Sequence, residues 1–382
     1  MFWLLTAGRV ENNMRILVTG AKGFIGTNLI IKLKSLNNID IDEYDMDNDL
    51  GSLYEYCSRA DFVFHLAGAN RPKDYAEYTK SNVNFTLQLI QILKEYNNSC
   101  PIMYASSIQA LLDNPYGKSK KEAEDLLIQY SKETGVKVLI YRLPNIFGKW
   151  CRPNYNSVIA TFCYKNAHNE PITIDNPDTK LTLLYIDDLI EELIDSTSGK
   201  EKRVGDYCEV KEVYEVTLGK TADLIRSFQH DRARLLIPDM SDAFTKKLYS
   251  TFLSYLPEQD LSYELKMNRD HRGSFTEFLK QAQMGQLSVN ITKPGIVKGN
   301  HWHNTKIEKF LVVSGKGIIR LRKITSDVVI NYYVSGEKFE VIDIPSGYTH
   351  NLENTGQSDM ITIIWANESF DSNKPDTYYM EV

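Results

Sequence analysis

The stretch Gly295-Ile-Val-Lys-Gly-Asn-His-Trp-His-Asn-Thr-Lys-Ile-Glu-Lys-Phe-Leu-Val-Val-Ser-Gly315 carries two histidines and a glutamate at short intervals. On a β-strand, side chains at i and i+2 point to one face, so His301 and His303 would aim at one point while Trp302 faces away. After a turn, Glu308 would return on the neighbouring strand within reach of that point. Imidazole and carboxylate groups are ligands for divalent cations, so the stretch predicts a metal site built on β-strands.

A further imidazole lies downstream. The segment Pro345-Ser-Gly-Tyr-Thr-His350 predicts a turn at a strand end, from which His350 can join the same site. The spacing G-x5-H-x-H-x4-E-x6-G and the segment P-x-G-x-x-H resemble the two motifs of the cupin superfamily. The resemblance implies zinc or another divalent metal held by His301, His303, Glu308 and His350.

Two flanking segments leave the role of His301 open. Asp270-His-Arg-Gly273 and Lys298-Gly-Asn-His301 are similar to segments of the metal-free sugar-nucleotide 3,5-epimerases of the cupin class. In those enzymes the histidine at the position of His301 is the base, and the likeness also makes Arg272 a candidate substrate contact. His301 is therefore a metal ligand or a base, and the other ligands nearby favour a ligand.

Short runs of β-branched and aromatic residues surround these motifs and are broken by Gly, Pro and Asn. Closely spaced runs of this kind are typical of a β-barrel or jelly roll. We expect a cupin domain, a jelly-roll β-barrel, over residues 261–382, after a linker that begins near Glu258. The predicted strands are 287–291, 309–313, 317–322, 328–334, 339–344 and 360–365.

The chain has 382 residues, which is enough for two domains, since single cores rarely grow beyond about 300 residues. We expect a first domain over residues 14–257, preceded by an N-terminal extension, residues 1–13. Hydrophobic residues make up 42% and charged residues 25%, the usage of a globular protein. The net charge of -6 argues against nucleic acid as the main partner.

Cysteine usage and the N-terminus indicate the compartment. The five cysteines are odd in number, widely spaced and lack a C-x-x-C pair, so we interpret them as reduced packing residues. The first ten residues contain only a short apolar patch, too little for a signal peptide or a membrane span. We therefore expect a cytoplasmic protein without membrane insertion.

The first domain opens with a short apolar strand, Arg15–Gly20, which runs into Gly20-Ala-Lys-Gly-Phe-Ile-Gly26 and then an amphipathic segment through Leu36. In a strand, glycine turn and helix, the backbone can approach a pyrophosphate at the helix N-terminus. Further on, Asp61–Gly68 predicts a buried strand that ends in a small-residue loop, where a cofactor would pass. The motif predicts nucleotide binding.

A second predicted strand begins at Ile39 and ends among carboxylates, with no Arg close by: Asp42, Glu43, Asp45 and Asp47. Acidic residues at this place accept a hydrogen bond from the ribose 2′-OH of NAD, while an Arg would pair with the 2′-phosphate of NADP. This local chemistry favours NAD.

Tyr116-x-x-x-Lys120 follows another predicted strand end, at Ser106-Ser107. The spacing places Tyr116 and Lys120 one turn apart on the same helix face. A ketone that accepts hydride must also take a proton, and a phenol titrates near 10 in water. We expect Lys120 and the nicotinamide charge to lower the pKa of Tyr116, so that Tyr116 supplies the proton.

These motifs resemble the extended short-chain dehydrogenase/reductase family, whose N-terminal domain is an α/β Rossmann fold. The resemblance makes Ser107, Tyr116 and Lys120 the catalytic residues. It implies a cofactor site formed by the same Tyr116 and Lys120 with Gly20, Gly23, Phe24, Ile25, Gly26, Leu66, Ala67, Gly68 and Asn82. Dehydratases of this family carry Asp-Glu after the hydroxyl residue. Here Ile108 and Gln109 follow Ser107, so the domain should reduce a ketone without dehydration.

A predicted loop after Tyr141–Gly148 combines cations, aromatic rings and amides. Cations suit phosphates and aromatic faces suit stacking, so the loop is suited to a nucleoside diphosphate. The candidate substrate residues in this loop are Lys149, Arg152 and Asn154. Asn145, just before the loop, is a further candidate by resemblance to the reductase family.

A reductase of this kind followed by an H-W-H cupin resembles the CapF family, bifunctional enzymes of bacterial capsule and O-antigen precursor synthesis. The resemblance implies a UDP-activated 2-acetamido-2,6-dideoxy-4-ketohexose as substrate. The cupin would invert C3, and the reductase would reduce C4 to give UDP-2-acetamido-2,6-dideoxy-L-talose, a precursor of UDP-N-acetyl-L-fucosamine. It also implies NADPH, zinc and a homodimer, against the local preference for NAD.

Three other functions stay open. The protein is a plain 4-ketoreductase if the cupin is structural or only senses a sugar. It is a non-catalytic sensor or scaffold if it only binds a dinucleotide and a sugar, although intact Ser107, Tyr116 and Lys120 argue against this. Three histidines and a glutamate also suit Fe(II), as in a cupin dioxygenase.

Overall fold

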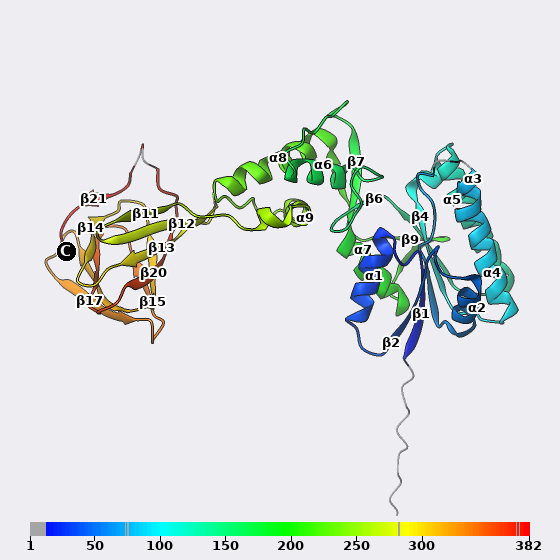
Figure 1. Ribbon diagram of the computed structural model, residues 1–382, viewed down its shortest axis with the longest axis horizontal. Helices are drawn as coiled ribbons and strands as arrows, with labels where there is room; N and C mark the ends of the chain where they lie inside the picture. The colour runs from blue at the N-terminus through cyan, green and yellow to red at the C-terminus, as the bar shows by residue number, and fades with distance from the viewer. Residues whose placement is uncertain (1–12, 73, 75, 282, 372, 374) are drawn as a thin grey trace, which may run out of the picture. The chain divides into compact units, whose positions relative to one another are not determined.

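The computed structural model describes residues 13–382 except 73, 75, 282, 372 and 374. All but the last residue of the expected N-terminal extension lie outside the described residues. The chain divides into two compact units, one formed by residues up to Ile225 with Ser250–Tyr255, the other by Arg226–Tyr249 with Leu256–Val382 (Figure 1). The limits expected from the sequence, 14–257 and 261–382, stay a prediction.

The first unit is an α/β fold around a seven-stranded sheet of order β2-β1-β3-β4-β5-β9-β8, in which only β8 pairs antiparallel. Its strands are β1 Met14–Thr19, β2 Ile39–Tyr44, β3 Phe62–His65, β4 Ile102–Ser107, β5 Val138–Leu143, β8 Lys202–Val204 and β9 Tyr207–Glu209. A second sheet has the order β10-β7-β6, with β6 Asn145–Phe147, β7 Lys180–Tyr185 and β10 Tyr214–Thr217.

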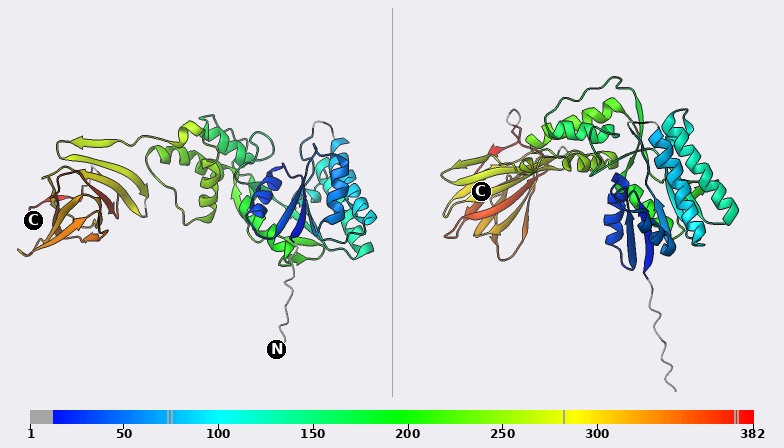
Figure 2. Two further views of the ribbon diagram at one scale, coloured as in Figure 1. Left: turned by 60° about the horizontal axis from the view of Figure 1, so that its bottom comes forward. Right: turned by 45° about the vertical axis from the view of Figure 1, so that its right-hand side comes forward.

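Helices cover both faces of the large sheet (Figures 1 and 2). Helix α1 packs beside α7, and α4 packs beside α2 and α5. The helical segments up to the second unit are α1 Phe24–Lys34, α2 Leu50–Arg59, α3 Ala76–Tyr78, a π-helical turn at Thr79–Asn84, α4 Phe85–Glu95, a 3-10 turn at Ile108–Leu111, α5 Pro115–Thr134, α6 Val158–Ala167 and α7 Ile186–Thr197. Helices α8 Leu218–Ala233 and α9 Ala243–Leu253 and a 3-10 turn at Glu258–Leu261 follow.

Strand burial explains this layered fold. Ile16, Leu17 and Val18 of β1 are fully buried, and all of β3 is buried. Continuous apolar runs of this kind suit a parallel sheet with helices on both faces. Because the chain runs from β1 to β2 on one side and then crosses to β3 on the other, the carboxyl ends of β1 and β3 flank a topological switch point, where such sheets bind ligands.

The second unit contains two antiparallel sheets, of order β11-β12-β13-β20-β15-β18 and β17-β16-β19-β14-β21. Its strands are β11 Met267–Asp270, β12 Gly273–Gln281, β13 Gly285–Thr292, β14 Val297–Trp302, β15 Glu308–Ser314, β16 Lys316–Lys323, β17 Val329–Ser335, β18 Val341–Ile344, β19 Tyr348–Asn354, β20 Met360–Ala366 and β21 Tyr378–Tyr379. A core of alternate inward residues includes Phe310, Val312, Ile319 and Leu352. This is the all-β, cupin-like architecture expected from the sequence.

The six predicted runs fall on β13, β15, β16, β17, β18 and β20, and these predictions are confirmed, although β18 begins at Val341. One expectation was wrong. Glu308 begins β15, which belongs to the sheet opposite β14, so it does not lie on the strand that neighbours His301. Strand β14 lies between β19 and β21, and His350 of β19 pairs directly with His301.

The five cysteines are free and buried, as packing residues would be. Among the described residues, no helix is both long enough and apolar enough to cross a membrane.

A β-bulge precedes the histidine pair. The register of β14 against β19 shifts between Gly299 and His301, and Gly299 has φ +106°. A Cβ atom on Gly299 would lie 2.7 Å from His350 O and 2.9 Å from Asn351 Cα. The bulge turns the strand so that His301 faces the interior, and only glycine fits there.

We predict that Gly299→Ala lowers the free energy of unfolding by about 3 kcal/mol or more, because the new methyl group meets backbone and φ is positive. Chemical denaturation of the full-length protein measures this change. Gly295→Ala is the matched control, since Gly295 has φ +72° but open space around its Cβ position, and should cost about 1 kcal/mol. Equal losses in the two variants would contradict the steric account.

Candidate functional sites

The glycine turn lies at the switch point of the first unit. Gly20 has φ +71°, and a Cβ there would lie 2.7 Å from Ala67 N. A Cβ on Gly26 would lie 2.2 Å from Gly20 O, so helix α1 packs directly on the turn. Helix α1 begins at Phe24 with Gly23 as its N-cap and no side-chain cap. Its first amide groups, which include those of Phe24 and Ile25, are thus open to an anion.

The loop after β3 brings the other predicted cofactor residues together. Leu66 N donates to Thr19 O over 3.1 Å, which joins this loop to β1. A Cβ on Gly68 would lie 2.6 Å from Asn82 Oδ1 and 3.3 Å from Lys120 Nζ. Asn82 lies in a π-helical turn, a distortion common at functional sites. Its amide nitrogen donates to Ser119 Oγ over 2.8 Å, which ties the loop to helix α5.

The buried His65 holds the strand ends around this loop together, although the sequence analysis did not identify it as functional. His65 Nδ1 lies 2.8 Å from Thr19 Oγ1, and His65 Nε2 lies 2.8 Å from Thr86 Oγ1. Burial and the nearby charge of Lys120 lower the pKa of His65 to about 3, so the ring is neutral. A neutral ring can donate through one nitrogen and accept through the other, which joins the ends of β1 and β3 to helix α4.

An arginine lies close to the carboxylates at the end of β2, contrary to the expectation from the sequence. Arg59, at the end of helix α2, binds both oxygens of Asp42, with Nη2–Oδ1 2.7 Å and Nε–Oδ2 3.0 Å. Asp42 is thus already paired. Asp45 Oδ2 accepts from Lys22 N over 2.7 Å, and the ammonium of Lys22 pairs with Asp47. The edge therefore offers a cation as well as carboxylates, and the carboxylates alone do not decide the cofactor.

The predicted catalytic residues lie together at the end of β4. Tyr116 and Lys120 lie on helix α5, which begins at Pro115 with Asn114 as its N-cap; the Asn114 side chain accepts from Gly117 N over 2.8 Å. Burial raises the pKa of Tyr116 to about 12, although a hydrogen bond with Ser107 lowers it. With protein groups alone, the expected lowering of the Tyr116 pKa is therefore absent.

Burial of the phenol is the main cause of the raised Tyr116 pKa, and the Lys120 ammonium has other partners. It is buried, donates to Ala105 O over 2.8 Å and lies 4.7 Å from the centre of the Tyr104 ring. Burial lowers the pKa of Lys120 to about 8, while the charge of Glu124 opposes this. Glu124 is fully buried one turn further along α5 and binds Arg142 with both oxygens, over 2.9 and 2.6 Å.

The predicted substrate loop has the expected mixture of groups. Lys149 lies over the Trp150 ring at 5.3 Å and pairs with Asp187, while Arg152 lies over the Tyr155 ring at 5.3 Å. Among the other candidates, Asn145 is exposed on β6, and Asn154 has φ +54° and donates its backbone N–H to Thr161 Oγ1. The sequence analysis missed Arg71, whose Nη1 donates to Tyr155 O over 2.7 Å.

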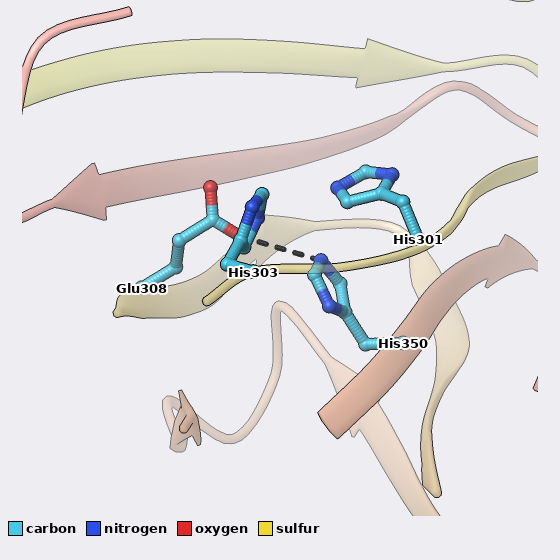
Figure 3. Close-up of side chains that lie close together, drawn as sticks. All are labelled: His301, His303, Glu308 and His350. Carbon is cyan, nitrogen blue, oxygen red and sulfur yellow. Dashed lines mark ion pairs between the residues drawn. The ribbon is translucent and has the colours of Figure 1, made fainter. Parts of the chain in front are cut away.

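The second unit gathers the four predicted metal ligands, His301, His303, Glu308 and His350, around one point (Figure 3). One ligand atom from each lies within 4.8 Å of all the others. Glu308 Oε2 is 3.4 Å from His303 Nε2 and 3.3 Å from His350 Nε2. Trp302 faces away and stacks on Tyr378 with ring centres 4.8 Å apart, as the strand alternation predicts.

The polar atoms of this cluster fit a cation. His303 Nε2, Glu308 Oε2 and both ring nitrogens of His350 are buried without a hydrogen-bond partner of suitable geometry among the described residues. Burial and the other two imidazoles lower the pKa of His301 to about 4, which keeps it neutral. Burial opposes ionisation of Glu308, but His303 and His350 hold its pKa well below the ordinary value. Neutral imidazoles with a carboxylate form a suitable ligand set for a divalent metal.

A cavity of about 380 Å³ opens beside this cluster and is lined by all four residues. It is also lined by cations, amides and a carboxylate: Arg272, Lys298, Asn290, Asn268 and Asp270. Lys298 Nζ donates to Asn290 Oδ1 over 2.9 Å, while Arg272 binds Asp270 over 2.7 Å. The predicted substrate residue Arg272 thus lies in the second unit, beside the histidine cluster.

Comparison with known proteins covers nearly the whole chain. Residues 16–195 match the NAD dependent epimerase/dehydratase family, and residues 268–378 match the polysaccharide biosynthesis C-terminal domain. UDP-2-acetamido-2,6-beta-L-arabino-hexul-4-ose reductase from Pseudomonas aeruginosa is 40% identical over 97% of this chain and 99% of that protein. The crystal structure of the capsular polysaccharide assembling protein CapF from Staphylococcus aureus is 52% identical, with a TM-score of 0.92 over 97% of this chain and 100% of that chain.

The chain belongs to the CapF family. A structure of UDP-glucuronic acid 4-epimerase from Bacillus cereus, with a TM-score of 0.54 over 65% of this chain and all of that one, is 18% identical and shows a shared fold only. Membership of the CapF family and the family match of the first unit support a nucleotide-sugar epimerase or reductase role with a nicotinamide cofactor.

The buried ammonium of Lys120 predicts a pH dependence of stability. Between its folded pKa of about 8 and its ordinary value of 10.5, the unfolded chain holds a proton that the folded chain has released. Stability of the wild type relative to Lys120→Met should therefore rise over this range, by about 3 kcal/mol. Urea denaturation at several pH values measures it, with Lys132→Met on the exposed side of the same helix as the control. A constant difference across this range would contradict the account.

Proposed function

We propose that the chain is bifunctional and acts on a UDP-2-acetamido-2,6-dideoxy-4-ketohexose. In this proposal the cupin-like domain inverts C3, and the Rossmann domain then reduces C4 to give UDP-2-acetamido-2,6-dideoxy-L-talose. The product would be a precursor of UDP-N-acetyl-L-fucosamine for capsule or O-antigen. The observation that carries the proposal is the presence of two sets of reactive groups in one chain: Ser107, Tyr116 and Lys120, and the histidine cluster beside its cavity.

The name of the Pseudomonas aeruginosa relative supports the substrate class, because a hexul-4-ose carries a ketone at C4. A 4-ketone also acidifies the hydrogen on C3. One substrate therefore suits both sites, and reduction of the ketone would remove the acidity at C3 and fix the new configuration.

In the reduction, the nicotinamide cofactor supplies the hydride. Tyr116 would donate its phenolic proton to the ketone oxygen, and Ser107 would hold that oxygen by a hydrogen bond. The positive charge of Lys120 would favour loss of the proton from Tyr116. Glu124, one turn further along α5, favours the charged form of Lys120.

In the epimerisation, we propose that His301, His303, Glu308 and His350 hold a divalent metal, with zinc as the first candidate. A cation held there would polarise the ketone oxygen, while a base takes the C3 proton from one face and an acid returns a proton to the other. Arg272 and Lys298 line the same cavity and would bind the diphosphate. Holding the sugar nucleotide in this way places its ketone near the cluster and restricts water around C3.

For the cofactor we propose NADPH, with NADH as the alternative. Asp42 is bound by Arg59, and Asp45 accepts hydrogen bonds from Lys22 N of the glycine turn and from Met46 N. The ammonium of Lys22 lies at this edge and suits a 2′-phosphate, although Asp47 competes for it.

We also propose a homodimer. Strand β17 is the outermost strand of its sheet and exposes apolar side chains, including Tyr333 at 77%. Phe339, just before the outer strand β18 of the other sheet, and Val341, the first residue of β18, are 68% and 54% exposed. Long apolar edges of this kind are usually covered, and a second copy would do so.

The two activities should separate by mutation. We predict that Tyr116→Phe abolishes NAD(P)H consumption, because the proton donor is lost, and that deuterium still exchanges into C3 in D2O. Absorbance of the reduced cofactor and mass spectrometry of the sugar measure the two. Loss of both activities in a folded Tyr116→Phe variant would contradict the division between domains.

The converse prediction concerns the cluster. His301→Ala or Glu308→Ala should stop C3 exchange and lower the melting temperature of the cupin-like domain, because each removes a metal ligand. Metal analysis and oxygen uptake on the wild type separate zinc chemistry from an Fe(II) dioxygenase. Normal exchange in a metal-stripped variant would make the metal structural and leave a 4-ketoreductase with a non-catalytic cupin.

A further inference from the structure

The C-terminal segment lies along the strand that carries the histidine pair. Tyr378 and Tyr379 form β21, which pairs with β14 so that Tyr379 lies opposite His301 and Tyr378 opposite Trp302. Beyond them, Met380 N donates to Asn300 O over 3.0 Å. The end of the chain therefore acts as a fifth strand of this sheet, next to the cluster.

At the start of this segment, the backbone of Asp376 contacts a proposed ligand. The Asp376 carbonyl oxygen forms a hydrogen bond with His303 Nδ1. A carbonyl can only accept, so Nδ1 must carry the proton. In the neutral ring the lone pair is then on Nε2, the nitrogen that lies 3.4 Å from Glu308 Oε2. This contact selects the tautomer that can bind a cation on the cluster side.

The Asp376 side chain binds the turn that joins His303 to Glu308. Its carboxylate accepts from the backbone N–H groups of Asn304, Thr305 and Lys306, over 2.9, 2.7 and 2.9 Å, and from Thr305 Oγ1 over 3.1 Å. Burial opposes ionisation, but these hydrogen bonds hold the pKa of Asp376 well below its ordinary value.

The 304–306 turn, which the Asp376 carboxylate binds, connects the two sheets of this unit. His303 follows the end of β14 in one sheet, and Glu308 begins β15 in the opposite sheet. The turn between them lies outside the strand pairing, because the paired residues of β14 end at Trp302 and β15 begins at Glu308. Four donor groups of the turn bind one carboxylate, which helps to hold two ligands from different sheets at their distance.

We propose that Asp376 is a positioning residue for the metal centre, acting through its carbonyl on the His303 ring and through its carboxylate on the 304–306 turn. This inference rests on the proposed function, because it requires that the cluster binds a metal. It assigns the last residues of the chain a part in the epimerase site, which neither motif of the cupin signature includes. Removal of a group that hydrogen-bonds a metal ligand typically lowers the metal affinity by about 10- to 100-fold.

The test measures Zn2+ affinity on the full-length protein by competition with a chromogenic chelator. Asp376→Ala removes all the carboxylate contacts but keeps the carbonyl, and should weaken Zn2+ binding by about 10- to 100-fold. Asp376→Asn retains one acceptor oxygen and should lose less. Asp371→Ala is the matched control: Asp371 accepts only from the nearby Asn373 N among the described contacts and should leave the affinity unchanged.

A second readout separates positioning from general loss of stability. With Co2+ in place of Zn2+, the visible absorption bands report ligand geometry, and they should change in Asp376→Ala and largely recover in Asp376→Asn. A wild type that binds neither ion would overturn the proposed metal site itself. A wild type that binds Zn2+, with a folded Asp376→Ala variant of equal affinity and unchanged Co2+ bands, would overturn the inference alone. If Asp376→Ala does not fold, unchanged affinity and bands in Asp376→Asn overturn it.

Discussion

Unpaired polar atoms buried inside the second unit impose the strongest constraint on this structure. Four ring or carboxylate atoms from His303, Glu308 and His350 lie in the interior without a hydrogen-bond partner of suitable geometry among the described residues. Each such atom costs about 1 to 3 kcal/mol unless a ligand satisfies it. The bulge at Gly299, the pairing of His301 with His350 and the turn bound by Asp376 position one ligand atom from each residue of the cluster around one point. The local architecture is therefore consistent with a cation site and costly without one.

The first unit has a comparable constraint in the buried ammonium of Lys120. Its hydrogen bond to Ala105 O and the Tyr104 ring partly compensate for lost water, and the Glu124–Arg142 pair lies one turn away. With its ammonium on Ala105 O, Lys120 does not offset the effect of burial on the pKa of Tyr116, which is raised to about 12. The hydrogen bonds of His65 and Asn82 join the strand ends and loops around this ammonium.

The sequence predicted what short-range spacing determines. Alternation on a strand placed His301 and His303 on one face with Trp302 opposite, and helical spacing placed Tyr116 and Lys120 on one face. It did not predict contacts between distant segments. Glu308 comes from the opposite sheet, Arg59 reaches Asp42 from another element, and Asp376 meets His303 from the end of the chain. The Tyr116 pKa was also misjudged, because burial dominates over a charge that points elsewhere.

The central claim, that one chain carries both an epimerase and a reductase, has a direct test. The purified protein is incubated with a UDP-4-keto-6-deoxy-hexosamine in D2O with NADPH or NADH, while cofactor absorbance and sugar deuteration are followed together. The account predicts oxidised cofactor and deuterium at C3 of the product. Oxidised cofactor without deuterium at C3 would contradict it and leave a plain 4-ketoreductase, and no reaction at all would favour a protein that only binds its ligands.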